Sequence, residues 1–385
     1  MTRNKTLELY FHIPFCVRKC LYCDFLSAPN TSEVQQAYMK ALCIEVKERA
    51  AEYAEYTVVS IFIGGGTPSL VEGKGIEQLM EVVHKHYVLA ADVEISIEMN
   101  PGTVDKEKLL AYRRAGINRL SIGLQSANDE ELKQLGRIHT YEEFLATYEN
   151  AVECGFSNIN VDVMSALPGQ TLDSYVSGLQ KVLALKPSPK HISAYSLIVE
   201  EGTPFYQMDE KGELELPDED TERVMYQETA RLLAEAGLER YEISNYAVKG
   251  YECRHNCGYW QRVNYVGFGI GAASMVENTR FANDTDLEAY ICEPTKQRSQ
   301  LQKLTLQEQM EETLFLGLRM AEGVSFQIFA ECFGQSMEEV YGSVIEKNIV
   351  DGLLTIRGED SNKRLLLTSK GMDVSNYVMA QFLLD

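Results

Sequence analysis

The sequence predicts an α/β protein in which a parallel sheet curls into an open, partial (β/α)6 barrel, followed by a smaller, mostly helical C-terminal unit of winged-helix type. Short β-rich runs alternate with longer helical patterns from Leu7 to about Leu197. A different pattern, of helices and two short strands, begins at Thr305. The chain has 385 residues and is 45% hydrophobic. It can therefore form the core of a large domain and the core of a second, smaller domain.

The pattern of the first half of the chain predicts six strands with five helices between them. The predicted strands span residues 7–13, 58–63, 93–98, 119–124, 158–164 and 191–197. The helical patterns between them, several of which follow Ser, Thr or Asp caps, span 32–53, 76–87, 105–115, 141–154 and 172–185. A helix between successive strands favours parallel pairing, so the carboxyl ends of the strands are expected at one common edge.

Beyond Glu200 the alternation stops. One more helix is predicted at 218–236, whereas the glycine- and aromatic-rich segment 251–275 gives no assignable pattern. The C-terminal unit is predicted from helices at 306–320 and 336–350, strands at 353–357 and 364–368, and a last helix. We therefore divide the chain into a barrel at 1–215, a barrel extension and linker at 216–300, and the C-terminal unit at 301–385.

Charge and cysteine content limit the partners. The net charge of −21 repels nucleic acid, and the winged-helix-like unit carries Glu338, Glu339 and Glu346 on its helices. Nine cysteines and a start without a signal peptide favour the reducing cytoplasm. No apolar run is long enough to span a bilayer, although transient membrane contact stays open.

Three cysteines, Cys16, Cys20 and Cys23, lie within eight residues of the loop that follows the first strand. They are too close together for unstrained disulfides, and no fourth Cys or His stands at a useful distance for a closed zinc site. Three thiolates suit an iron-sulfur cluster with one iron left open. The alternative, three buried structural cysteines, is disfavoured because Arg18 and Lys19 interrupt the run.

Further polar groups follow the other strands. A Gly-Gly-Gly-Thr-Pro turn at 64–68 allows a ligand to approach the backbone closely, although a tight strand-to-helix connection uses such turns as well. Glu98, Gln125, Arg137 and Asp162 together offer acceptors for an ammonium and for hydroxyls, and a cation for a carboxylate. Taken singly, each is also typical of a solvated strand end or a helix cap.

The Cys-x3-Cys-x2-Cys spacing of Cys16, Cys20 and Cys23 resembles the signature of radical S-adenosylmethionine (radical-SAM) enzymes. The resemblance implies a [4Fe-4S] cluster on these three cysteines and S-adenosylmethionine beside it, with the glycine turn against the amino group. The cofactor-binding positions that it implies are Tyr10, Tyr22, Gly65, Gly66, Thr67, Glu98, Gln125, Arg137 and Asp162.

Within that group, the whole chain is similar to the oxygen-independent coproporphyrinogen III oxidases and their relatives. The oxidases carry a fourth cysteine two places after the third and a longer amino-terminal segment, whereas this chain has Phe25 there and fifteen residues before Cys16. It has instead His-Asn-Cys-Gly-Tyr-Trp at 255–260, which resembles the His-Asn-x-x-Tyr-Trp motif of the radical-SAM heme chaperones (HemW). That resemblance implies a protein that binds heme and delivers it to an unidentified acceptor protein. Oxidase activity in porphyrin biosynthesis, or radical chemistry on another substrate, stays as an alternative.

His255 is the predicted axial heme ligand, because neutral imidazole binds heme iron well. Tyr259 and Trp260 are expected to stack on the porphyrin, although a His-Asn pair also caps helices and satisfies core turns. Cys253 and Cys257 either ligate heme or are inert. His12 and His139 are predicted either to contact the cofactor-binding residues rather than the cofactor, or to be structural. Cys43, Cys154, Cys292 and Cys332 lie in helical patterns and are predicted to be packed thiols.

Overall fold

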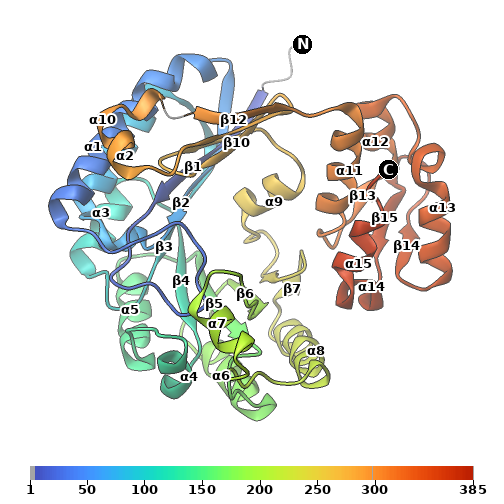
Figure 1. Ribbon diagram of the computed structural model, residues 1–385, viewed down its shortest axis with the longest axis horizontal. Coiled ribbons are helices and arrows are strands. Elements are labelled where there is room, and N and C mark those ends of the chain that lie inside the picture. The colour runs from blue at the N-terminus through green and yellow to red at the C-terminus, as the bar shows by residue number, and fades with distance from the viewer. Residues whose placement is uncertain (1–4, 297, 385) are drawn as a thin grey trace.

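The computed structural model describes residues 5–296 and 298–384, so residues 1–4, which the expectation about a signal peptide concerns, lie outside it. One curled sheet organises these residues, with strand order β12-β11-β10-β9-β1-β2-β3-β4-β5-β6-β8-β7 (Figure 1). Strands β1 to β6 pair in parallel. They are β1 (Lys5–Ile13), β2 (Tyr56–Gly65), β3 (Val88–Met99), β4 (Arg119–Gln125), β5 (Ile159–Ser165) and β6 (His191–Ser196). The predicted open parallel barrel is confirmed.

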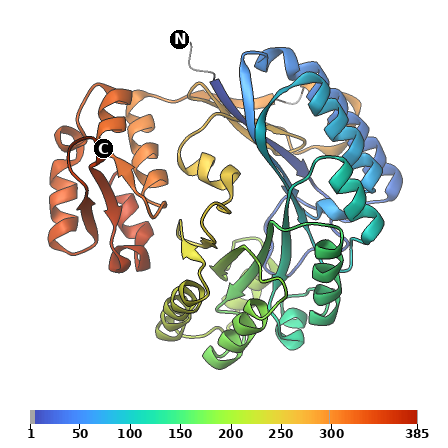
Figure 2. The same ribbon diagram turned by 180° about the vertical axis from the view of Figure 1, so that it is seen from behind.

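Helices cover the convex side of this sheet (Figure 2). They are α1 (Ser32–Arg49), α2 (Gly73–His86), α3 (Lys106–Arg114), α4 (Asp129–Gln134), α5 (Tyr141–Glu153) and α6 (Leu172–Leu183). In α2, the side chains of Ile76, Leu79, Met80 and Val83 are buried and form one apolar stripe at helical spacing. The short helices α4 and α7 (Pro204–Glu210) were not predicted, because they are too brief to show that periodicity.

The segment that gave no sequence pattern extends the sheet. It contains α9 (Arg254–Trp260), β9 (Tyr265–Phe268) and most of β10 (Ala273–Val276). β9 pairs in parallel with β1, and β10, β11 (Thr279–Asn283) and β12 (Arg298–Lys303) continue antiparallel. At the other edge of the sheet, β8 (Asn245–Ala247) pairs with β6, and β7 (Glu239–Arg240) pairs with β8. In the chain, both strands come after α8 (Glu219–Glu235). α9 lies on the concave side of the sheet (Figure 2).

The C-terminal unit has its own core, to which Leu314, Tyr341, Leu365 and Phe382 contribute. Its helices are α11 (Leu306–Gly317), α12 (Phe326–Phe333), α13 (Met337–Val350), α14 (Ser369–Asp373) and α15 (Ser375–Ala380). They pack with a small antiparallel sheet of β13 (Val324–Ser325), β15 (Arg364–Leu367) and β14 (Leu354–Arg357). The predicted helical unit with two strands is confirmed. The structure also contains α12 and β13, which were not predicted. The three-part division of the chain stays a prediction.

The predicted packed thiols divide into two groups. Cys43 and Cys154 are partly buried against the barrel core, as expected. Cys292 and Cys332 are exposed, so the prediction is wrong for them, because both stand on the solvent side of their helices. In the described ranges, no helix has the length and apolarity needed to cross a membrane.

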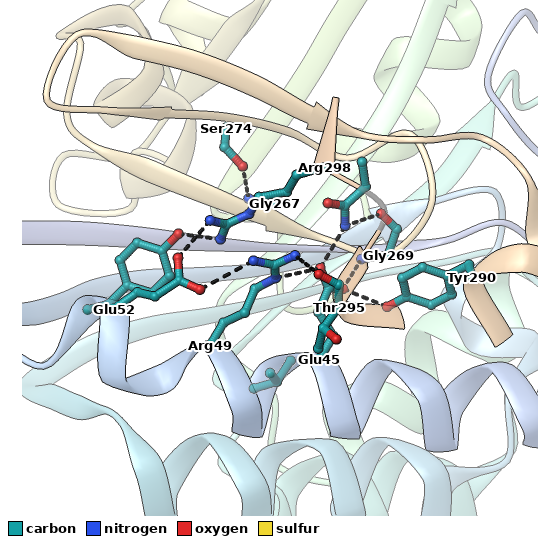
Figure 3. A network of polar contacts seen from close by, with 12 residues as sticks. Glu45, Arg49, Glu52, Gly267, Gly269, Ser274, Tyr290, Thr295 and Arg298 are labelled. Atoms are coloured by element: carbon teal, nitrogen blue, oxygen red, sulfur yellow. Dashed lines mark hydrogen bonds and ion pairs between the residues drawn. The ribbon is translucent and has the colours of Figure 1, made fainter. Parts of the chain in front are cut away.

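A buried polar network joins α1 to the sheet extension (Figure 3). The carboxylate of Glu45 accepts hydrogen bonds from Gly269 N (3.0 Å), Tyr290 Oη (2.6 Å) and Asn283 Nδ2 (2.8 Å). It also pairs with Arg49, whose Nε lies 3.3 Å away. Three hydrogen-bond donors and one cation therefore converge on one fully buried carboxylate.

Replacing Glu45 with Ala is expected to lower the free energy of unfolding by roughly 3 to 5 kcal/mol, because the buried Arg49 and three other donors lose their acceptor. Urea denaturation followed by far-ultraviolet circular dichroism measures this change. The matched control is Lys106→Ala, which removes the exposed ion pair with Glu153 and should lower the free energy of unfolding far less. A similar loss in both variants would contradict the assignment of Glu45 as a central support.

Candidate functional site

The carboxyl ends of the parallel strands and the loop after β1 enclose a cavity of about 400 Å³. This is the edge at which the βα alternation predicts a site. The cavity brings together most of the residues singled out in the sequence, namely Cys16, Cys20, Tyr22, Cys23, Gly65, Gly66, Thr67, Glu98, Gln125, Arg137 and Asp162. Tyr10 and His255 do not line it.

The cysteine loop is fixed by backbone contacts at both ends. Cys16 N donates to Ala28 O (3.2 Å) and Leu21 N donates to Leu135 O (3.1 Å). The three cysteines are free thiols of intermediate exposure. Among the described residues, no three His, Cys, Asp or Glu side chains converge closely enough to hold a single metal ion. Three thiols spread along one cavity wall instead suit a larger group with several irons.

The glycine turn packs directly against this loop. A Cβ at Gly66 would lie 2.7 Å from Phe15 O and 3.0 Å from Cys16 Sγ, and Gly65 has φ +116°. Thr67 donates its hydroxyl to Cys16 Sγ (3.5 Å). The glycines are therefore needed for the close approach of backbone to the cysteine loop. Their predicted contact with a ligand amino group stays a prediction.

Two half-buried carboxyl groups, Glu98 and Asp162, line the same cavity as the cysteines. Glu98 Oε2 accepts a hydrogen bond from Gly65 N (3.1 Å), and Asp162 accepts one from Asn160 Nδ2 (2.7 Å). Burial, and then the charge of Asp162, raise the pKa of Glu98 to about 8. Burial also raises the pKa of Asp162. The pair therefore favours a cationic partner.

Arg137 and Gln125 complete the wall. Arg137 Nη2 donates to Asn100 Oδ1 and to Gly123 O, both at 2.7 Å, and its Nη1 lies 3.7 Å from Cys20 Sγ. Gln125 has φ +70°, an uncommon backbone conformation for a residue with a side chain, and its buried Oε1 has no hydrogen-bond partner. The cavity therefore offers a fixed cation and an unused acceptor, which fits a polar ligand.

Among the cavity residues that were not predicted for the site, Asn100 and Tyr195 contact predicted positions. Asn100 donates its Nδ2 to Thr67 Oγ1 (2.9 Å) while accepting from Arg137, so it links two predicted positions. Tyr195 lies beside Asp162. The sequence could have indicated them, because Asn100 directly follows β3 and Tyr195 is near the end of β6. Several of the predicted residues also lie at the carboxyl ends of the parallel strands.

His255 lies on α9 inside the barrel, with 1% of its surface exposed. Its ring stacks on Phe62 at a centroid distance of 5.2 Å, and its Nδ1 is 2.9 Å from Ser60 Oγ. Its Nε2 is buried without a hydrogen-bond partner. Burial, and then the charge of Arg119, lower the pKa of His255 to about 3, so the imidazole is neutral.

Tyr10 lies beside His255 rather than in the cavity of the cysteines. The ring of Tyr10, a predicted cofactor residue, stacks on His255 at 6.5 Å and 29°. The ring nitrogens of His12 and His139 contact the carbonyls of Leu26 and Leu124, and neither histidine lines the cavity.

Two family models match parts of the chain, the Radical SAM superfamily at residues 10–180 and the HemN C-terminal domain at 304–374. A protein named Heme chaperone HemW from Bacillus subtilis (strain 168) is 37% identical over 378 residues, or 97% of this chain and 98% of that protein. Its namesake from Lactococcus lactis subsp. lactis (strain IL1403) is 36% identical over 99% of this chain and 98% of its own length.

A solved structure of coproporphyrinogen III oxidase (HemN) from Escherichia coli, a radical SAM enzyme, has the same fold. The TM-score is 0.84 at 23% sequence identity, covering 99% of this chain and 90% of that one. At this identity the match concerns the fold alone. The level of identity with the two HemW proteins, sustained over nearly the full length, is the deciding observation: the chain belongs to the HemW family of heme chaperones, within the Radical SAM superfamily.

Proposed function

We propose that this chain is a heme chaperone, which binds heme and transfers it to an acceptor protein while holding a [4Fe-4S] cluster and S-adenosylmethionine. The observation that carries the proposal is the nearly full-length similarity to proteins named Heme chaperone HemW. Phe25 adds support, since it lines the cavity and is 63% exposed where the oxidases carry a further cysteine.

The donor set fits the two cofactors. Cys16, Cys20 and Cys23 would hold the cluster, which when bound and reduced supplies an electron for cleaving the sulfonium bond. Glu98 would hold the ligand's ammonium and Arg137 its carboxylate, because Glu98 offers a carboxyl group and Arg137 a fixed cation in the cavity. Asp162 and Gln125 would bind the ligand's ribose or neighbouring polar atoms, since Gln125 Oε1 has no hydrogen-bond partner within the protein.

Binding of S-adenosylmethionine is expected to depend on pH through Glu98. Its pKa of about 8 means that the carboxyl is mostly protonated at pH 6 and half ionised at pH 8. An ammonium favours the carboxylate, so affinity should rise over this range and binding should release a proton. Calorimetry in two buffers with different ionisation enthalpies measures that release, and a proton count of zero at pH 6.5 would contradict the assignment.

The raised pKa of Glu98 also affects the stability of the folded protein when no ligand is bound. Because the folded pKa lies above the ordinary value of 4.5, the contribution of Glu98 to stability is fully present below pH 4.5. It is lost as the pH rises through about 8. Bound S-adenosylmethionine should offset this loss, since it provides a counter-charge.

The prediction that His255 ligates heme iron makes a specific demand on the fold. Its Nε2 is buried between α9 and β2, so iron reaches it only if α9 moves away from the sheet. The absorption spectrum of the heme complex of His255→Ala tests the prediction. An unchanged Soret band would remove His255 as the ligand without affecting the proposed chaperone function.

The decisive experiment uses anaerobically reconstituted, full-length protein. We expect it to bind about one heme per chain, assuming that the single His-Asn-x-x-Tyr-Trp motif marks one site. We also expect no conversion of coproporphyrinogen to protoporphyrinogen in the presence of S-adenosylmethionine and a reductant. If the protein decarboxylates coproporphyrinogen, the oxidase reading replaces the chaperone reading; if it binds no heme, the proposed function fails.

A further inference from the structure

A second cavity, of about 300 Å³, lies between the end of α9 and the C-terminal unit, and we call it the α9 groove. One wall is formed by Trp260, Gln261 and Arg262, and the other by residues of α11, α12 and β13. Figures 1 and 2 both show α9 between the sheet and the C-terminal unit. The groove is therefore separate from the cavity that holds the three cysteines.

The two faces of α9 have different surroundings. His255 faces the sheet, and Gly258 packs so closely there that a Cβ would lie 2.0 Å from Glu8 Oε1. Trp260 is five residues beyond His255, which is about 140° around a helix. Its indole lines the groove instead. The motif at 255–260 thus contributes one aromatic residue to a surface outside the barrel.

The groove is apolar along its walls. Trp260 lies opposite Phe329, Phe333 and Val324, and Ile328 leaves 57% of its surface exposed at the opening. Trp260 Nε1 is buried without a hydrogen-bond partner, and the guanidinium of Arg319 stacks on the indole at 4.3 Å. Aromatic and aliphatic walls that face each other across a narrow space suit a flat apolar ligand.

Two cations are also part of the lining, although the chain as a whole carries a charge of −21. Arg262 is held in place by Glu312, with Nε 3.1 Å from Oε2. Arg364 donates to Gly323 O (2.7 Å) and lies 3.3 Å from Glu322, the acidic residue of the lining. Guanidinium groups fixed in this way can each take a further carboxylate.

We propose that the α9 groove binds the heme that is carried, with the macrocycle against Trp260 and Phe329 and the propionates toward Arg262 and Arg364. This rests on the proposed function and is the alternative to iron ligation by His255, whose buried Nε2 does not line the groove. Unlike that ligation, it needs no movement of α9. A volume of about 300 Å³ is at the lower end for pockets that enclose drug-sized ligands. Heme would therefore be held by one edge, with the rest accessible to an acceptor protein.

The test compares heme affinity among variants of the full-length, reconstituted protein. Ile328→Glu places an anion beside the apolar face and the propionates, and should weaken heme binding at least about tenfold. Ile328→Lys removes the same apolar contact but adds a cation, so it should weaken binding less. Val350→Glu is the control, because Val350 is an exposed apolar residue (86%) of the same unit outside the groove, and its affinity should be unchanged.

Alkylation gives an independent readout in the unmodified chain. Cys332 is exposed and lines the groove, whereas Cys292 is exposed elsewhere. Heme should slow the reaction of iodoacetamide with Cys332 and leave that of Cys292 unchanged, as measured by peptide mass spectrometry.

If heme binds but protects neither cysteine, and Ile328→Glu binds it like the wild type, the groove assignment is overturned while the chaperone function stands. Protection of Cys332 by an apolar peptide but not by heme would also overturn it, in favour of a peptide-binding groove. If wild-type protein binds no heme at all, it is the proposed function that fails.

Discussion

Replacing Cys20 with Ser is expected to leave reconstituted protein with almost no bound iron, compared with about four irons per chain in the wild type. Cys20 shares the cavity wall with Cys16 and Cys23, and three thiolates are the full donor set that the loop provides. A serine hydroxyl does not ionise near neutral pH and is a poor ligand for iron in a cluster. The loss should therefore be nearly complete, and Cys16→Ser and Cys23→Ser should behave in the same way.

Iron and sulfide analysis measures this effect, and electron paramagnetic resonance of the reduced wild type should change when S-adenosylmethionine is added. Cys292→Ser is the matched control, because Cys292 is exposed and outside the cavity, and it should retain the cluster. A cluster of unaltered content in Cys20→Ser would remove the loop as its site.

Replacing Glu98 with Gln is expected to weaken S-adenosylmethionine binding by about tenfold to a hundredfold. The amide keeps the size of the side chain and an acceptor for Gly65 N, but it cannot carry the charge that faces an ammonium. Losing a charged partner in a buried site costs roughly 1.5 to 3 kcal/mol. The proton release expected for the wild type below pH 8 should disappear together with the affinity.

Arg137→Ala should weaken binding to a similar extent through the ligand's carboxylate. Because Arg137 Nη1 is 3.7 Å from Cys20 Sγ, iron content must be measured in parallel, so that a loss of the cluster is not mistaken for a loss of ligand contacts. Glu142→Gln, an exposed change on α5, is the control. Wild-type affinity in both Glu98→Gln and Arg137→Ala would mean that the ligand binds elsewhere.

The sequence by itself determined the barrel and most of the cavity that carries these predictions. The positions of Glu98, Gln125 and Asp162 were readable because each stands in or at the end of a parallel strand, and parallel strands bring their carboxyl ends to one edge. The cysteines were readable from spacing alone, since all three lie on one short loop. In these cases a local pattern and one topological rule fix the neighbours.

Only the tertiary structure decided where α9 lies and what it touches. Gly258 against Glu8, and His255 against Phe62 and Tyr10, are contacts between segments far apart in the chain. Because of these contacts, His255 lies in the barrel interior whereas Trp260 of the same motif lines the α9 groove. The physical reason is that a seven-residue helix has too few turns to show which side is buried, so its orientation is set by the surfaces that pack against it.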